Sequence, residues 1–170
     1  MTPISTKNQQ LTIENWLSFM RLLIQRVKEA QVVIGGRIHS RISQGLLLLL
    51  GIEESDSQED IDFLCKKTTQ IRLFNDDNGV MNLSVQEAGG ALMVVSQFTL
   101  YAQTKKGNRP SYIRAARPER AIPLYEQFVH TLQQLSGKEI ATGVFGADMQ
   151  VSLCNDGPVT IFIDSKMRDF

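Results

Sequence analysis

Aliphatic and β-branched residues dominate residues 21–43, and a glycine pair, Gly35 and Gly36, divides this segment into two runs. Adjacent glycines suit the positive φ angles of a tight turn, so the pattern predicts a β-hairpin. The next run, GLLLLLGI at residues 45–52, is bounded by glycines. It is far shorter than the roughly 20 residues that a membrane-spanning helix needs. We therefore predict a strand that is buried on both faces.

The hydrophobic period changes to that of a helix after residue 55. Ile61, Leu64, Cys65, Thr68 and Ile71 recur at helical spacing. Ser57 stands shortly before Asp60, which approximates a capping box at the start of this helix. A second helix is predicted to begin near Pro118 and to end at Gly137. Its inward stripe is expected to consist of Leu124, Phe128, Leu132 and Leu135.

The remaining segments carry turn and strand signals. Residues 75–79 and the pair Gly89 and Gly90 predict turns, whereas residues 91–103 and 139–165 predict strands. This order of elements predicts an α+β fold, with a curled, barrel-like, mostly antiparallel β-sheet and two main helices. We expect one domain over residues 20–170. The polar residues 1–19 lack the features of a signal or transit peptide and are expected to form a poorly ordered extension, with Met20 as an alternative start.

Composition narrows the range of functions. The formal net charge is zero and the pI is about 6.7, so any contact with nucleic acid is expected to be local. Cys65 and Cys154 lack metal-type spacing and are interpreted as buried thiols of a cytosolic protein. His39 and His130 have no acidic partner at useful spacing, and the sequence contains no H-E-x-x-H, C-x-x-C or G-x-S-x-G motif. We therefore expect neither a serine–histidine hydrolase nor a zinc enzyme.

Two short stretches carry candidate chemistry. SQFTLY, residues 96–101, stands at the end of an apolar strand, where polar side chains begin. NDGPVTIFIDS, residues 155–165, places Gly157 and Pro158 at the head of an alternating apolar run, although proline cannot donate to a sheet ladder. Taken singly, the first stretch is explained by ordinary strand-end residues and the second by an edge position.

Taken together, the two stretches have the forms S-Q-x-x-L, at residues 96–100, and N-x-G-P-x-T, at residues 155–160. In this order and spacing the chain resembles the D-aminoacyl-tRNA deacylase family, formerly called the D-tyrosyl-tRNA deacylases. The resemblance runs from Met20 to about Ser165. It includes MRLLIQRV at residues 20–27 and IRLFNDDNGVMNLSV at residues 71–85.

The resemblance implies a reaction and a site. The reaction is hydrolysis of the ester bond of D-aminoacyl-tRNA, without a required metal or other cofactor, by a cytoplasmic homodimer with active sites at the subunit interface. The implied catalytic residues are Ser96, Gln97, Phe98 and Thr99. The implied residues for substrate binding and chiral selection are Arg26, Asn155, Gly157, Pro158 and Thr160. In the family the Gly-Pro bond is cis, the pair projects into the partner's active site, and an arginine at the position of Arg26 braces the loop.

The implied mechanism selects by rejection. Backbone groups of the Gly-Pro loop leave no room for an L side chain, so many D-amino acids are expected to pass, and glycyl-tRNA as well. Two mechanisms of ester cleavage are open. Either Thr99 is the nucleophile, or water attacks with the assistance of the tRNA 2′-hydroxyl. We favour water, because the sequence offers Thr99 no evident general base.

The loop between Lys105 and Arg120 holds six positive residues against the single Glu119. Lys105, Lys106 and Arg109 are candidates for contacts with the phosphates of tRNA, and a merely solvated loop is an equal alternative. A second function of another class is a nucleic-acid-binding module on the same fold, with incidental or lost deacylase activity. The sequence does not specify which tRNAs or amino acids are preferred.

Overall fold

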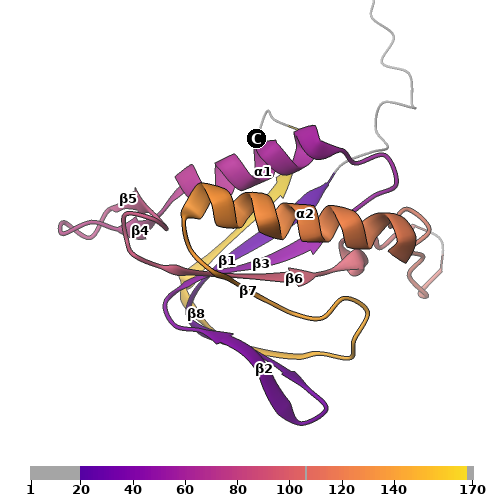
Figure 1. Ribbon diagram of the computed structural model, residues 1–170, viewed down its shortest axis with the longest axis horizontal. Helices are drawn as coiled ribbons and strands as arrows, with labels where there is room; N and C mark the ends of the chain where they lie inside the picture. The colour runs from indigo at the N-terminus through magenta and orange to yellow at the C-terminus, as the bar shows by residue number, and fades with distance from the viewer. Residues whose placement is uncertain (1–19, 106, 168–170) are drawn as a thin grey trace, which may run out of the picture.

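A computed structural model describes residues 20–105 and 107–167, and the extension predicted for residues 1–19 lies outside the described residues (Figure 1). The first strand, β1 (Arg21–Ile34), turns directly into β2 (Arg37–Ile42). Gly35 and Gly36 form this turn with φ angles of 56° and 76°. These left-handed values explain why the turn needs glycine, and the predicted hairpin is confirmed.

The main sheet is built around β1. One edge of β1 pairs with β3 (Gly45–Gly51) and further along with β2, and its other edge pairs with β8 (Gln150–Asp164), all antiparallel. Beyond β3, the sheet continues in parallel through β6 (Ala91–Ser96) to β7 (Ile140–Thr142). The side chain of Ser40 on β2 donates to the carbonyl of Thr142 on β7 at 2.7 Å, so the sheet curls back on itself. The predicted α+β class and curled sheet are confirmed.

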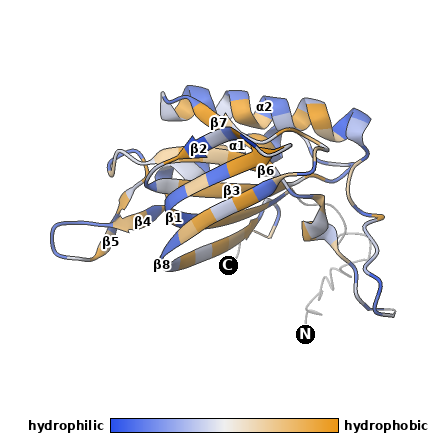
Figure 2. Ribbon diagram, turned by 90° about the horizontal axis from the view of Figure 1, so that it is seen from below, coloured by the Kyte–Doolittle hydropathy of each residue, from blue (hydrophilic) through white to orange (hydrophobic). Residues whose placement is uncertain are grey.

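Two helices lie side by side over one face of this sheet (Figures 1 and 2). The first, α1 (Gln58–Gln70), begins with the predicted capping box between Ser57 and Asp60. The second, α2 (Pro118–Ser136), has proline at its first position and ends at Gly137, whose φ is 65°. The prediction that Leu135 faces inward is wrong, because this residue is 46% exposed. No helix among the described residues is long and apolar enough to cross a bilayer.

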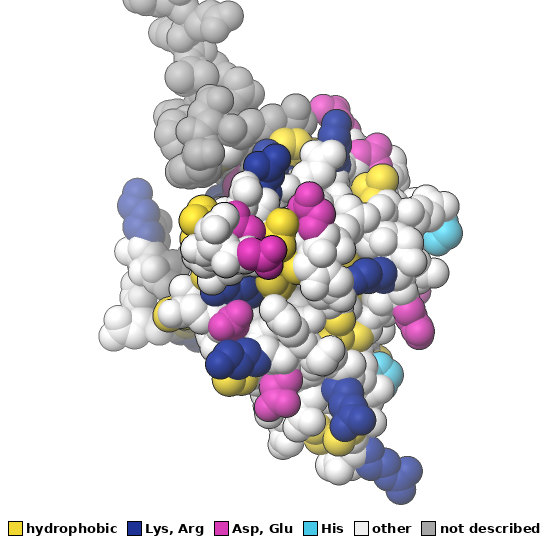
Figure 3. Space-filling model, turned by 90° about the vertical axis from the view of Figure 1, so that its left-hand side faces the viewer, with side chains coloured by type: hydrophobic (Ala, Val, Ile, Leu, Met, Phe, Trp, Pro, Cys, Tyr) yellow, Lys and Arg dark blue, Asp and Glu magenta, His cyan; other side chains and the backbone are white. Residues whose placement is uncertain are grey.

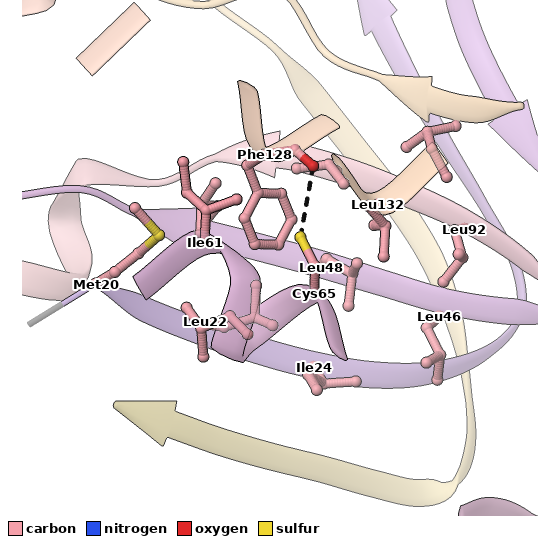
Figure 4. Packing of buried hydrophobic residues seen from close by; sticks show 14 of the residues in the cluster. Met20, Leu22, Ile24, Leu46, Leu48, Ile61, Cys65, Leu92, Phe128 and Leu132 are labelled. Atoms are coloured by element: carbon pink, nitrogen blue, oxygen red, sulfur yellow. Dashed lines mark hydrogen bonds between the residues drawn. The ribbon is translucent and has the colours of Figure 1, made fainter. Parts of the chain in front are cut away.

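β3 is buried on both faces, as predicted. Leu46, Leu48 and Leu50 join the core beneath the helices, where Phe128 of α2 packs beside Cys65 of α1 (Figure 4). Leu47 points the other way, into a second apolar cluster inside the curl of the sheet. The alternation of hydrophobic and polar residues along the outer strands is visible in Figure 2.

The two cysteines differ in environment. Cys65 is buried, its Sγ lies 3.6 Å from the carbonyl oxygen of Phe128, and burial raises the pKa of its thiol. Cys154 is exposed, so the prediction of two buried thiols is wrong. The exposed residues around Cys154 belong to β8, whose outer edge is not paired by another described strand.

Three further elements, β4, β5 and η2, were not predicted. β4 (Arg72–Asn75) and β5 (Met81–Ser84) form a separate two-stranded sheet around the turn at residues 75–79. The strand predicted over residues 91–103 ends early, because β6 stops at Ser96 and a 3₁₀ turn, η2 (Phe98–Tyr101), follows. This change of direction brings the SQFTL residues to the end of the sheet.

Candidate functional site

The Gly157–Pro158 pair lies in a bulge of β8 rather than in its ladder. On β1, Gln25 pairs with Thr160 and Val27 pairs with Asn155, so residues 156–159 stand opposite Arg26 alone. A bulge removes residues from the hydrogen-bonding ladder and turns them outward. The missing N–H of Pro158 therefore breaks no strand pairing, which explains how proline fits within a long strand.

Arg26 fills the space behind this bulge. Its residue surface is only 7% exposed, and its Nε donates to the carbonyl oxygen of Asp156 at 3.0 Å. The same nitrogen lies 3.2 Å from the carboxylate of Asp156, and Nη1 donates to the carbonyl oxygen of Leu73. A planar guanidinium suits such fixed, divergent contacts. The predicted bracing contact between Arg26 and the loop is present.

Gly157 has a φ of +125°, a region in which side chains are rarely found. A Cβ placed on it would approach Cγ2 of Val159 to 2.9 Å and Nη2 of Arg26 to 3.0 Å. The peptide bond that follows is cis, as the resemblance implied. Asn155, Gly157, Pro158 and Thr160 are all exposed. The loop thus presents its backbone to the outside.

The SQFTL residues form the second half of the site. The N–H of Gln97 donates to the carbonyl oxygen of Leu50 at 2.7 Å, which ties the turn to the end of β3. The side-chain amide of Gln97 donates to the hydroxyl of Thr99. Phe98 is 56% exposed and stands edge-on to Tyr112 with ring centroids 5.0 Å apart. Ser96, Gln97 and Thr99 are half-buried at the end of the sheet.

Within one chain the two halves are apart. The turn lies at the level of Leu22 on β1, because Leu22 pairs with Leu50 and Leu50 binds Gln97. The bulge lies at the level of Arg26. These levels are four positions apart along β1, or about 13 Å at the rise of a β-strand. One chain therefore supplies a rigid loop on the edge strand β8 and a separate polar turn at the end of the inner strand β6.

The basic loop divides into two parts. Lys105 and Arg109 are exposed, and Lys106 lies outside the described residues. Arg114, in contrast, forms an ion pair with Glu53 at 3.5 Å. Arg120 donates to the carbonyl oxygen of Asp56 at 2.7 Å. Arg114 and Arg120 thus tie the second half of the loop to the acidic turn before α1, whereas Lys105 and Arg109 in the first half are exposed.

Asp56 is fully buried beside this loop. Burial raises the pKa of Asp56 to about 7, and the nearby Asp60 and Glu53 carboxylates add to the rise, whereas the N–H of Glu53 opposes it. One carboxylate oxygen accepts that N–H at 2.7 Å. The other has no hydrogen-bond partner among the described residues. Because Arg120 donates to the backbone carbonyl of Asp56, this buried carboxyl lies at the place where the basic loop is attached.

The ionisable groups elsewhere in residues 20–105 and 107–167 do not form a metal site. Among the described residues, no group of three or more His, Cys, Asp or Glu side chains is placed to hold a metal ion. His39 and His130 are exposed, on β2 and α2. On the face shown in Figure 3, basic and acidic side chains are interspersed rather than gathered by sign.

Sequence reasoning missed several contributors to the site. Tyr112, which packs on Phe98, and the carbonyl of Leu73, which accepts from Arg26, carry no motif. An aromatic residue within an otherwise basic loop was the available signal for Tyr112. A backbone carbonyl has no sequence signal.

A protein family and several curated proteins match most of this chain. The family model described as D-Tyr-tRNA(Tyr) deacylase matches residues 23–164. Curated proteins named D-aminoacyl-tRNA deacylase from Bacteroides thetaiotaomicron and Flavobacterium johnsoniae are each 59% identical over 150 residues, which is 88% of this chain and 100% of theirs.

Two solved structures share this fold. A structure described as the c-Myc DNA Unwinding Element Binding Protein is 37% identical, with a TM-score of 0.80, over 84% of this chain and 97% of that one. A second, described as a probable eukaryotic D-amino acid tRNA deacylase, has a TM-score of 0.74 at 15% identity, over 86% of this chain and 99% of that one. At that identity the likeness concerns the fold alone.

Proposed function

The chain belongs to the D-Tyr-tRNA(Tyr) deacylase family, and on that premise we propose that it hydrolyses the ester bond of D-aminoacyl-tRNA. Free D-amino acid and tRNA are the products. The observation that carries the proposal is the match to curated deacylases along their whole length. The geometry supports it, because both motifs of the family lie at exposed or half-buried positions rather than in the core.

Chiral selection falls to the loop at residues 156–159. Neither Gly157 nor Pro158 has a polar side-chain atom, so the loop offers a ligand its backbone carbonyl groups. Carbonyl oxygens accept from the protonated α-amino group of the substrate, and a rigid backbone beside it excludes a side chain of L configuration. The buried guanidinium of Arg26 keeps the loop in one conformation. Glycyl-tRNA has no side chain to exclude, so it is a substrate as well.

Hydrolysis takes place at the SQFTL turn. Phe98 and Thr99 begin the 3₁₀ turn η2, where backbone N–H groups have no partner within the turn. These donors receive the negative charge that develops on the carbonyl oxygen in the tetrahedral state. A water molecule attacks the carbonyl carbon, the bond to the terminal ribose oxygen breaks, and that oxygen takes up a proton. The 2′-hydroxyl of the tRNA assists the water, and Ser96 and Gln97 position the substrate.

The complete site needs two subunits. The loop and the turn are about 13 Å apart along β1 within one chain. A twofold-related copy brings the loop of one subunit to the turn of the other, and each subunit then contributes to both sites. Exposed apolar side chains on β8, Leu153 and Phe162, support an interface there. We assign Lys105 and Arg109 to the tRNA phosphates, and the cytoplasm as the place of action.

One observation favours a second candidate function. The structural relative described as a DNA unwinding element binding protein shares the fold at substantial identity. A nucleic-acid-binding module with incidental or lost deacylase activity is therefore the alternative. It predicts binding of nucleic acid without turnover of the ester.

The deciding experiment uses the purified full chain with D-tyrosyl-tRNA and L-tyrosyl-tRNA in parallel, each corrected for spontaneous hydrolysis. The proposal expects rapid release of D-tyrosine and no acceleration for the L form. If the protein binds the tRNA but hydrolyses neither ester, the result supports the alternative, a nucleic-acid-binding module. Equal release of both forms contradicts chiral selection by the loop.

A further inference from the structure

Arg21, the first residue of β1, holds the SQFTL turn in place. Its Nη1 donates to the carbonyl oxygen of Leu100 at 2.8 Å. Its Nε donates to the carboxylate of Asp164 at 3.3 Å, and that carboxylate side chain is only 2% exposed. The guanidinium also lies over the ring of Tyr101, with its central carbon 4.8 Å from the ring centroid. One side chain thus joins β1, β8 and the turn.

These contacts satisfy a need of the turn itself. A short 3₁₀ turn leaves its last carbonyl groups without partners inside the turn. Within η2, Leu100 donates to Gln97 and Ala102 donates to Thr99, whereas the carbonyl of Leu100 faces Arg21. A charged donor forms a stronger hydrogen bond than a neutral one, so Arg21 fixes this end of the turn.

Tyr101 completes the attachment. It is buried, and its hydroxyl donates to the carbonyl oxygen of Gly51 at 3.2 Å. Gly51 itself leaves no spare room: a Cβ there would approach the Tyr101 ring to 3.0 Å and Cβ of Leu100 to 3.2 Å. The turn is therefore pressed against the end of β3 and cannot shift without loss of these contacts.

We propose that Arg21, held by Asp164 and Tyr101, is a positioning residue for deacylation, which sets the angle of the SQFTL turn toward the substrate ester. The inference rests on the proposed function. Arg21 touches no catalytic side chain; it acts through the backbone of Leu100 and the ring of Tyr101. Its loss shifts the donors at Phe98 and Thr99 away from the oxyanion position and leaves the substrate-binding loop at Arg26 in place.

The test compares Arg21→Ala and Arg21→Lys with a matched control, Lys138→Ala. Lys138 also donates a charged hydrogen bond to a backbone carbonyl, that of Gly90 at 2.7 Å, but beside the opposite end of β6. We expect Arg21→Ala to lower kcat on the order of tenfold with KM changed less than about twofold. Arg21→Lys restores most of kcat because it keeps a charged donor. Lys138→Ala keeps the kcat of the parent.

A second measurement works without substrate. Amide exchange of Leu100 and Ala102 reports the hydrogen bonds of the turn directly, with the amides of α2 as an internal reference. Exchange on the order of tenfold faster at these two amides in Arg21→Ala alone supports the inference. Unchanged exchange, or equal losses of kcat in Arg21→Ala and Lys138→Ala, overturns it. If the parent protein releases no amino acid, the proposed function fails, and amide exchange alone decides the role of Arg21.

Discussion

Arg26 donates from Nε to the carbonyl oxygen of Asp156 at 3.0 Å, although the two residues are 130 positions apart in the chain. The bulge in β8 exists opposite this one residue. A buried guanidinium thus takes the place of the ladder hydrogen bonds that the strand gives up there. This contact determines how firmly the exposed Gly157–Pro158 backbone is held.

Replacement of Arg26 therefore tests the loop. In Arg26→Leu the carbonyls of Asp156 and Leu73 lose their donor, and we expect about 2–4 kcal/mol lower stability to unfolding. We expect a larger effect on selection, with hydrolysis of L-tyrosyl-tRNA rising relative to the D form. Denaturant unfolding and paired hydrolysis assays measure the two effects. Arg72→Leu, which alters an exposed arginine bound to Asn82, is the control and keeps both properties.

The shared active site is tested by mixing two inactive variants. Gly157→Ala disturbs the loop, because its Cβ meets Arg26 and Val159. Gln97→Ala removes one polar side chain of the turn, the one that donates to Thr99. Each variant alone is expected to lose most of its activity. After joint refolding, half of the dimers contain one intact site, which gives about a quarter of the parent activity. Activity no higher than the average of the separate variants contradicts a site shared between subunits.

Thr99→Ala distinguishes water attack from a covalent route. The hydroxyl of Thr99 accepts from the side-chain amide of Gln97, which cannot act as a general base. We expect kcat within about fivefold of the parent, whereas loss of a true nucleophile costs on the order of a thousandfold or more. Rapid-quench assays of the parent are expected to show no burst of acyl-enzyme. A burst with the stoichiometry of active sites that disappears in Thr99→Ala establishes Thr99 as the nucleophile.

Charge reversal at Lys105 and Arg109 examines the tRNA contact. Both residues are exposed in the part of the basic loop that is not held by the turn before α1. The double variant is expected to raise KM for aminoacyl-tRNA on the order of tenfold, with a smaller change in kcat and a weaker dependence on salt. Lys66→Glu, at an exposed position on α1, is the matched control. If both variants leave KM and its salt dependence unchanged, this loop does not bind tRNA.

The buried carboxyl of Asp56 predicts a pH dependence of stability. Burial raises the pKa of Asp56 from 3.8 to about 7 in the folded protein. Folding then takes up a proton between pH of about 4 and about 7, so this group makes the protein less stable as pH rises through that window and adds no further change above it.

Asp56→Asn removes this contribution and keeps an oxygen that accepts from the N–H of Glu53. We expect the variant to gain stability relative to the parent as pH rises from 5 to 8, by up to several kcal/mol. Asp60, Glu53 and Lys166, which influence the carboxyl, remain in both proteins. Thermal unfolding across this pH range measures the difference. A constant difference between parent and variant at all pH values contradicts the raised pKa.

The local elements of this protein follow from short stretches of sequence. The hairpin at Gly35 and Gly36, the capping box at Ser57 and the end of α2 at Gly137 each depend on residues within a turn or two. Such features can be read from the chain because near neighbours set the backbone angles and the first hydrogen bonds. Both motifs of the site also stand in the sequence, and the family resemblance they carry is confirmed by the comparisons.

Other features depended on contacts between distant segments. No local pattern shows that Asp156 faces Arg26, that Arg21 reaches Leu100, or that Cys154 lies on an outer edge. The early end of β6 and the capture of Arg114 by Glu53 likewise arise from neighbours in space. The sequence predicted the main strands and helices and the two motifs of the candidate site. The tertiary structure decided which of them are held, which are exposed and how far apart they lie, because burial and pairing depend on the packed fold as a whole.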